Sequence, residues 1–235
     1  MAVMQKNEKD YLGSEITTIE GLKYIEPINN YRYLGNLYTN LGIVLSEIGR
    51  TEEARKYFTL SNEVNNENEL NNGKEQISLD YFNNMGLSYN KEDKYNKGIH
   101  FFKRGLELVD SLKYKHPRQY ESLLGNLSYS YFKLGKNNIA LDGYKNVLTS
   151  KINRNDTYGL SGTYTLIAHF YFESKNFEKS LFNFLKAREL GLKTKNSKRI
   201  LQSLNYLSKL TKGEQSKKYL QEYIQLNDSL FERER

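Results

Sequence analysis

The 235-residue chain contains no cysteine, no tryptophan and only two prolines. Without cysteine it forms no disulfide and offers no thiolate for catalysis or metal binding. This absence does not fix the compartment, because cytoplasmic and periplasmic proteins can both lack cysteine. The scarcity of proline and the lack of a long Gly/Ser tract argue against a flexible linker between separate globular parts. We therefore expect residues 1–235 to form a single array.

Long apolar runs are also missing. No stretch approaches the ~18–20 residues that a helix needs to span a bilayer, and the N-terminal region has no apolar signal-peptide core. The start, Met1-Ala2-Val3-Met4, resembles an added leader, so the lack of a targeting signal says little about the compartment. We expect residues 1–13 to be a frayed leader, and any membrane contact to run through a segment outside this chain.

Signals of catalysis are weak. The three histidines, His100, His116 and His169, show no metal-ligand spacing. The chain has neither a phosphate-binding Gly-rich loop nor a nucleophile elbow. Its carboxylates fall mostly at predicted turns and outer helix faces, although an acid/base pair assembled in space would escape this test. The sequence predicts no catalytic residue, no metal and no cofactor.

The net charge of +7 results from 35 basic and 28 acidic residues. Many lysines lie beside acidic residues, as in Glu52–Lys56, which is typical of a solvated helix face. A denser cluster could meet an anion; it consists of Lys193, Lys195, Lys198 and Arg199. Nucleic-acid binding would favour a basic stripe with interleaved aromatics or a known motif. Neither is present, so we expect no nucleic-acid partner.

What the chain does contain is one pattern of small and aromatic residues that occurs four times. The copies are Gly42, Ala54 and Phe58; Gly86, Gly98 and Phe102; Ser128, Ala140 and Tyr144; and Ala168, Ser180 and Phe184. In each copy the second small residue follows the first by twelve positions, and the aromatic follows four positions later. Small residues let a second helix approach closely, and the aromatic fills the space beside them. Each copy predicts a helix, a tight turn and an antiparallel helix.

The predicted turns are short and polar. They are Ile48-Gly49-Arg50, Glu92-Asp93-Lys94, Leu134-Gly135-Lys136 and Ser174-Lys175-Asn176. Gly49 and Gly135 fall where a helix ends in a left-handed residue, which glycine adopts at little cost. One such hairpin cannot bury its own apolar face, so neighbouring hairpins must stack into a solenoid. The alternative, an ordinary bundle with chance periodicity, is disfavoured by four copies with fixed internal spacing.

This pattern is similar to the tetratricopeptide repeat (TPR), whose period is about 34 residues. Here the first small residues are 44, 42 and 40 positions apart, so either the helices or the loops are longer. We predict polar loops at Val64–Lys74 and around His116-Pro117. The resemblance implies an all-α fold, an α-α superhelix (TPR solenoid) of about five helical hairpins with a concave groove.

The ends of the array are less regular. Ser14–Ile25 has the apolar spacing of the second helix of an incomplete repeat, and near the C-terminus Ser216 follows Ser208 by only eight positions. The last hairpin is therefore about one turn short, as a polar cap would be. The predicted divisions are 14–29 (partial repeat), 30–73, 74–116, 117–155, 156–195 and 196–235 (shortened repeat).

An asparagine precedes the first small residue by two positions in three copies: Asn40, Asn84 and Asn126. Leu166 and Tyr206 take the equivalent place in the next two repeats. In a stacked array these positions form a column on the concave face. An amide both donates and accepts hydrogen bonds, and the resemblance implies that such a column holds a peptide backbone. The alternative is that asparagine here is merely part of the repeat consensus.

The same face changes character along the chain. Its first half carries Ile43, Ser46, Leu87 and Asn90, and its second half carries Tyr129, Phe132, His169 and Phe172. Aromatic side chains on a concave face are typical anchors for a peptide or protein partner. We expect Tyr129 and His169 to be exposed, whereas packing against the neighbouring repeat is favoured for Phe132 and Phe172. The predicted groove residues are Asn40, Asn84, Asn90, Asn126, Tyr129, Phe132, His169 and Phe172.

The segment Tyr219–Leu230 resembles the close of TPR arrays in bacterial membrane sensor histidine kinases. That resemblance implies a non-enzymatic input domain on the periplasmic side of the inner membrane, with a helical connector beginning at Glu232–Arg235 and a possible homodimer through the C-terminal helix. Two alternatives stay open: a stand-alone cytoplasmic TPR adaptor or peptide receptor, and the TPR part of a transcriptional regulator.

Overall fold

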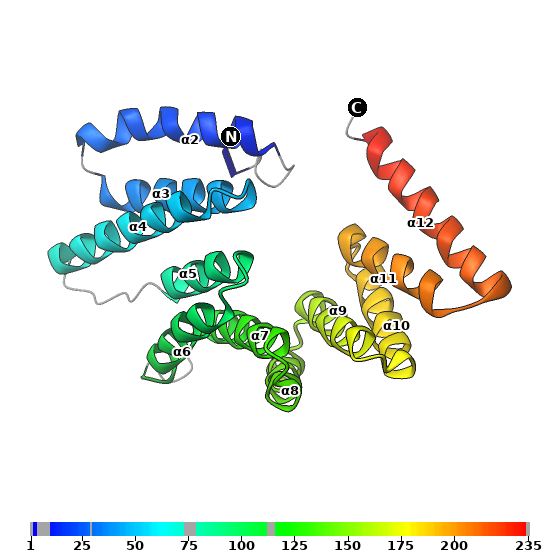
Figure 1. The fold of residues 1–235 in the computed structure, drawn as a ribbon. Helices are drawn as coiled ribbons and strands as arrows, with labels where there is room; N and C mark the ends of the chain where they lie inside the picture. Colours follow the sequence, from blue (N-terminus) through cyan, green and yellow to red (C-terminus); the bar gives the residue numbers. More distant parts are fainter. Residues whose placement is uncertain (1, 4–9, 29, 73–78, 112–115, 234–235) are drawn as a thin grey trace. The chain divides into compact units, whose positions relative to one another are not determined.

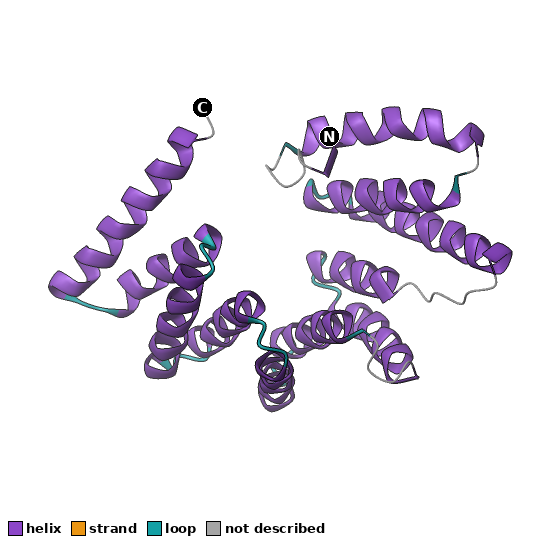
Figure 2. Cartoon of the chain, turned by 180° about the vertical axis from the view of Figure 1, so that it is seen from behind, coloured by secondary structure: helices purple, strands orange, loops and turns teal. Residues whose placement is uncertain are grey.

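The chain folds into helices joined by short turns. The computed structural model describes residues 2–3, 10–28, 30–72, 79–111 and 116–233 (Figure 1). Within these ranges the backbone forms only helices and loops, without a strand (Figure 2). The predicted all-α fold class is confirmed.

The helices pack into two compact units, Met1–Gly135 and Lys136–Arg235. In the first unit the elements are α2 (Tyr11–Ile25), η1 (Glu26–Ile28), α3 (Tyr31–Glu47), α4 (Thr51–Asn72), α5 (Leu79–Lys91), α6 (Tyr95–Ser111) and α7 (Pro117–Lys133). Helix α3 packs against α2 and α4, α6 packs against α5 and α7, and α5 lies beside both α4 and α7. This order is that of stacked helical hairpins.

The second unit repeats the arrangement. Its helices are α8 (Asn137–Asn153), α9 (Thr157–Glu173), α10 (Phe177–Lys193), α11 (Ser197–Leu210) and α12 (Gly213–Arg233). Each helix packs against the next along the chain, and α11 also lies beside α9. Each of the five predicted repeats spans two consecutive helices. The boundary between the two units falls inside the predicted repeat 117–155, in the turn between α7 and α8.

The small-residue and aromatic pattern forms the centre of the α3–α4 and α5–α6 hairpins. A Cβ atom placed on Gly42 would lie 2.5 Å from the Phe58 ring, and one on Gly86 would lie 2.4 Å from the Phe102 ring. Phe58 is 3% exposed and Phe102 is fully buried. Burying such a ring contributes on the order of 1.5–3 kcal/mol. The glycines therefore provide the space in which these rings pack.

The four predicted turns lie where expected, between α3 and α4, α5 and α6, α7 and α8, and α9 and α10. Gly49 and Gly135 have φ values of +88° and +74°, as predicted for left-handed helix ends. At the corresponding places Asp93 and Lys175 have φ values of +56° and +58° although they carry side chains. The turn geometry is therefore kept even where glycine is replaced, at a cost of roughly 1–2 kcal/mol per non-glycine residue.

Two expectations about irregular segments were wrong. Residues 64–72 of the predicted loop Val64–Lys74 belong to helix α4, which runs to Asn72. No Gly or Pro interrupts the segment before Gly73, so nothing in its sequence ends the helix. Residues 73 and 74 lie outside the described part. Helix α2 begins at Tyr11, inside the predicted leader, because Asp10 accepts a hydrogen bond from the Gly13 N–H and caps the helix.

Pro117 opens helix α7, as predicted from its fixed φ and missing N–H group. Helix α11 has 14 residues against 17 in α9. The Ser180 hydroxyl donates to the carbonyl of Ala168, twelve positions earlier, over 2.9 Å. In the last hairpin the Ser216 hydroxyl donates to the carbonyl of Ser208, eight positions earlier, over 2.6 Å. Shortening the hairpin by about one turn thus preserves its central backbone contact.

Candidate binding groove

A groove of about 450 Å³ lies on the first unit, along the sides of α3, α5 and α7. Its lining consists of Ile43, Ser46, Glu47, Phe58, Asn84, Leu87, Asn90, Lys91 and Tyr129. These helices are the first helices of consecutive predicted repeats, whose side chains the sequence placed on the inner face. The groove brings together three of the predicted site residues, namely Asn84, Asn90 and Tyr129.

Two of the predicted site residues on α5, Asn84 and Asn90, differ in the hydrogen bonds that their amides make. Asn90 is 8% exposed, and its Nδ2 donates to the Ser130 hydroxyl on α7 over 2.8 Å. Its Oδ1 also lies against Gly98, where an added Cβ would be only 2.3 Å away. Asn90 is thus held by its neighbours. Asn84 is half-buried, and no hydrogen-bond partner for its amide is found among the described residues. The Asn84 amide can therefore bind a ligand without breaking an internal bond.

Apolar side chains form much of the remaining surface. Leu87 and Tyr129 are 36% and 38% exposed, and Ile43 is half-buried. The Tyr129 ring is positioned by the ring of Tyr95, at a centroid distance of 6.4 Å, and by Lys133, whose Nζ lies 5.9 Å from its centre. The expected exposure of Tyr129 agrees with this position.

One ion pair crosses the groove. Lys91 Nζ donates to Glu47 Oε1 over 2.8 Å and to the Ser46 carbonyl over 3.0 Å. The bridge joins the last turn of α5 to the last turn of α3, where a cation also meets the negative end of the helix. Both charged side chains are more than one third exposed, so the pair contributes at most about 1 kcal/mol to stability. Its larger effect is to neutralise the charge of Lys91.

The other two asparagines of the predicted column face the protein itself. Asn40 is 6% exposed, and its Nδ2 donates to the Thr18 hydroxyl on α2 over 2.8 Å. The presence of α2 beside α3 therefore removes Asn40 from the groove. Asn126 donates through Nδ2 to Asn83 Oδ1 over 2.8 Å and so links α7 to α5. Of the three amides, only that of Asn84 has no described partner.

The aromatic residues predicted for the second half of the face form a packed cluster. His169 packs edge-on against the rings of Phe184 and Tyr206, which stack on each other, at centroid distances of 5.2 and 4.5 Å. Burial lowers the pKa of His169, because the charged imidazolium loses hydration. The Phe172 ring packs edge-on against Tyr206 at 5.0 Å, in agreement with the packing role favoured for it. The cluster joins α9, α10 and α11, so His169 is less exposed than expected.

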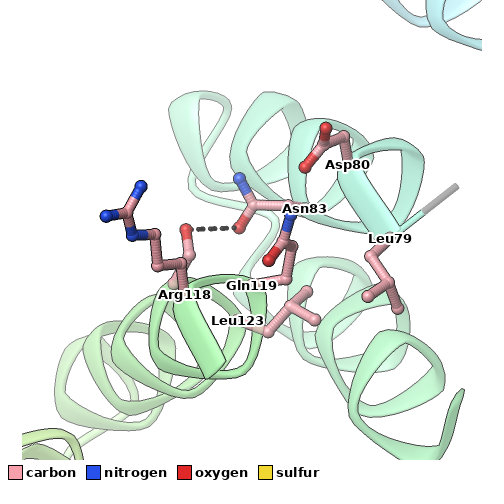
Figure 3. A pocket seen from close by; sticks show the side chains of 7 residues that line it. Leu79, Asp80, Asn83, Arg118, Gln119 and Leu123 are labelled. Atoms are coloured by element: carbon pink, nitrogen blue, oxygen red, sulfur yellow. Dashed lines mark hydrogen bonds between the residues drawn. The ribbon is translucent and has the colours of Figure 1, made fainter. Parts of the chain in front are cut away.

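Phe132 is half-buried on α7, and it does not line the groove. A smaller pocket of about 180 Å³ lies between the first turns of α5 and α7 (Figure 3). Asn83 of α5 lies opposite Gln119 of α7 there, and the Ser122 hydroxyl donates to Asn83 Oδ1 over 3.3 Å. Asp80 and Arg118, which both line this pocket, carry opposite charges. The pocket therefore favours neither anionic nor cationic ligands.

Sequence reasoning missed the contribution of Glu47, Lys91 and Phe58 to the groove. Phe58 was assigned only to the hairpin centre, although it also lines the groove. The Glu47–Lys91 pair joins residues 44 positions apart, so the spacing within one helix could not predict it. The only signal available was that both residues lie at the ends of predicted first helices.

Two other kinds of site were sought in the described ranges. There, no group of three or more His, Asp or Glu side chains is placed to hold a metal ion. None of the helices within the same ranges is long and apolar enough to cross a membrane.

Comparison with protein families gives one match: residues 35–68 match the model of the tetratricopeptide repeat. This segment begins within α3 and covers most of α4. No curated protein sequence matches the chain significantly.

Several solved structures share the fold. BtubC (BKLC) from P. vanneervenii has 12% sequence identity and a TM-score of 0.71, and 94% of this chain and 91% of that chain are covered. A signal transduction ATPase with numerous domains and a tetratricopeptide repeat sensor, from Pyrococcus horikoshii, has 19% identity and a TM-score of 0.74. Aspartyl phosphate phosphatase F from Bacillus subtilis has 13% identity and a TM-score of 0.72.

The matches to the ATPase and to the phosphatase each cover 97% of the present chain. They cover only 35% of the ATPase and 58% of the phosphatase. At such low identities the similarity concerns the fold. Together with the family match and the helical hairpins, it identifies the chain as an all-α protein with the fold of a tetratricopeptide repeat solenoid.

Proposed function

We propose that the chain is a non-catalytic binding domain that holds a peptide or protein segment in the groove of its first unit. The observation that carries this proposal is the amide of Asn84, which has no hydrogen-bond partner among the described residues and lies in the same groove as the exposed side chains of Leu87 and Tyr129. This combination offers one polar group that can pair with a peptide bond and an apolar surface beside it.

Asn84 supplies both a donor and an acceptor, so it can pair with a backbone carbonyl and N–H without reading the side chain between them. Each such hydrogen bond contributes about 0.5–1.5 kcal/mol. Tyrosine is enriched among residues that dominate binding energy, because it buries a large rigid surface at low entropic cost. Tyr129 is therefore the expected anchor, with Asn84 fixing the backbone beside it.

The biological setting proposed for this domain is the input region of a bacterial two-component histidine kinase. Its support is the resemblance of Tyr219–Leu230 to the end of such arrays. The Pyrococcus horikoshii protein, whose name includes a tetratricopeptide repeat sensor, gives a further analogy at the level of the fold. Under this proposal, ligand binding is transmitted through the C-terminal helix α12. The genomic sequence following Arg235 tests the setting: a membrane span and a kinase core support it, whereas a stop codon supports a stand-alone adaptor.

Binding itself is tested by selecting ligands for the full chain from a random peptide library. Affinities of the selected peptide are then compared for the wild type, Asn84→Ala and Tyr129→Ala. We expect each variant to bind about tenfold more weakly, which corresponds to a loss of ~1.4 kcal/mol. Asn96→Ala is a matched control, because Asn96 is exposed on α6 and does not line the groove. Equal affinities of all four proteins would contradict the proposed site.

A further inference from the structure

We infer that the groove binds an internal, uncharged chain segment with a bulky apolar side chain, rather than a free C-terminal carboxylate. The inference rests on the proposed function and specifies the chemistry of its ligand. It follows from the charges and apolar contacts of the groove, taken in turn.

A terminal carboxylate needs an available cation at the site, because burying an unpaired charge is costly. Among the described residues that line the groove, only Lys91 is cationic, and its ammonium already contacts Glu47 Oε1 at 2.8 Å and the Ser46 carbonyl at 3.0 Å. A carboxylate approaching Lys91 would also approach Glu47. The Lys91–Glu47 pair therefore offers no net attraction to a C-terminal carboxylate, and Glu47 repels an acidic side chain.

A second cation, Lys133, lies one turn after Tyr129 on α7 and does not line the groove. Its Nζ is 5.9 Å from the centre of the Tyr129 ring, within the ~6 Å range of a cation–π contact. The ring face of Tyr129 thus already interacts with this ammonium. A ligand that drew Lys133 away would lose the positioning of its own aromatic anchor.

The remaining groups of the groove are neutral. Leu87 and Tyr129 present apolar area, and Phe58, only 3% exposed, also lines the groove. The volume of about 450 Å³ falls within the ~300–1,000 Å³ range of small-ligand sites. It accommodates a large aliphatic or aromatic side chain together with the adjoining backbone. The Asn84 amide is the neutral partner that this backbone requires.

The test uses two random peptide libraries against the full chain. In the first, both ends of each peptide are fused to constant sequence; in the second, each peptide ends in a free carboxylate. The selected peptide is then synthesised with an acid and with an amide terminus, and its affinity is measured by fluorescence polarisation at low and high salt. Leu87→Ser is compared with Leu60→Ser, because Leu60 is 39% exposed on α4 and lies outside the groove.

We expect binders from the first library, with affinities that change less than about threefold on amidation or addition of salt. Leu87→Ser should weaken binding about tenfold, and Leu60→Ser should leave it unchanged. Binders that come only from the second library, or a tenfold loss on amidation, would overturn this inference while leaving peptide binding intact. If neither library yields a peptide sensitive to Asn84→Ala, the proposed function fails and this inference fails with it.

Discussion

The replacement of Gly86 by alanine tests how closely the hairpin helices approach. An alanine Cβ at this position would lie 2.4, 2.6 and 2.8 Å from three ring atoms of Phe102, far inside normal contact distance. Phe102 is fully buried in the hairpin centre, so its ring has no open space into which to move. Gly125, in helix α7 of the same unit, is the matched control, because no neighbouring atom lies within 4 Å of a Cβ built there.

The expected magnitudes follow from two opposing effects. Replacing glycine by alanine inside a helix stabilises it by about 1 kcal/mol, because alanine restricts the unfolded chain. Gly125→Ala should show this gain alone. Overpacking of a filled core costs about 1–3 kcal/mol, so Gly86→Ala should range from neutral to about 2 kcal/mol destabilising. In the difference between the two variants the helix-propensity gain cancels, and the steric cost of about 1–3 kcal/mol remains.

Urea unfolding followed by circular dichroism measures both variants against the wild type. The urea concentration at the midpoint should rise for Gly125→Ala and should fall or stay unchanged for Gly86→Ala. The slope of the unfolding free energy against urea concentration should be the same for both variants and the wild type. In a thermal melt the expected separation is about 2–4 °C for each kcal/mol. Equal stabilisation of both variants would refute the close approach of Gly86 to Phe102 and the register of the repeat.

Three further measurements test the assigned roles. Asn126→Ala should lower the free energy of unfolding by about 1 kcal/mol, since it removes the bond between α7 and α5, whereas Asn84→Ala should change it by less than about 0.5 kcal/mol; a reversed order in chemical denaturation would contradict both assignments. Hydrogen bonds, first from Lys94 and then from other donors, lower the pKa of Glu92 to about 2. The Glu92 carboxylate therefore stabilises the fold fully above its ordinary pKa of 4.5, and this stabilisation is lost as the pH falls from 4.5 towards 2. The free energy of unfolding of Glu92→Gln should accordingly fall less steeply than that of the wild type over this pH range. Ala140→Leu should cost about 1–3 kcal/mol because Ala140 is fully buried, and an unchanged melting temperature would show that its position can expand.

Much of the fold could be predicted because each repeat is defined by the spacing of small and aromatic residues that lie close together in the sequence. The positions of Gly42 and Phe58, sixteen residues apart, indicated the contact that the structure shows. The four turns were predicted because helix ends depend on neighbouring residues, and their left-handed geometry persists even where Lys175 replaces glycine. The extension of α4 to Asn72 was missed because polar composition was taken as a sign of a loop, although nothing in the segment breaks a helix.

The candidate site could be predicted only in part. Asn84, Asn90 and Tyr129 were placed on the inner face by periodicity, and they do line one groove. Periodicity could not separate Asn84 from Asn40, because both stand two residues before a glycine in a first helix. The difference arises from the neighbouring helix, in which Thr18 offers a hydroxyl to Asn40.

The sequence by itself determined that the chain is built of helical hairpins, since small and aromatic residues at fixed spacing can bury their faces in no other simple way. Only the tertiary structure decided which polar side chains are available for binding. Hydrogen bonds such as that of Asn90 to Ser130, and ion pairs such as that of Lys91 to Glu47, join residues about forty positions apart. These bonds occupy polar side chains that the sequence alone would suggest are available for a ligand. The Asn84 amide stays available in the groove, together with the exposed side chains of Leu87 and Tyr129.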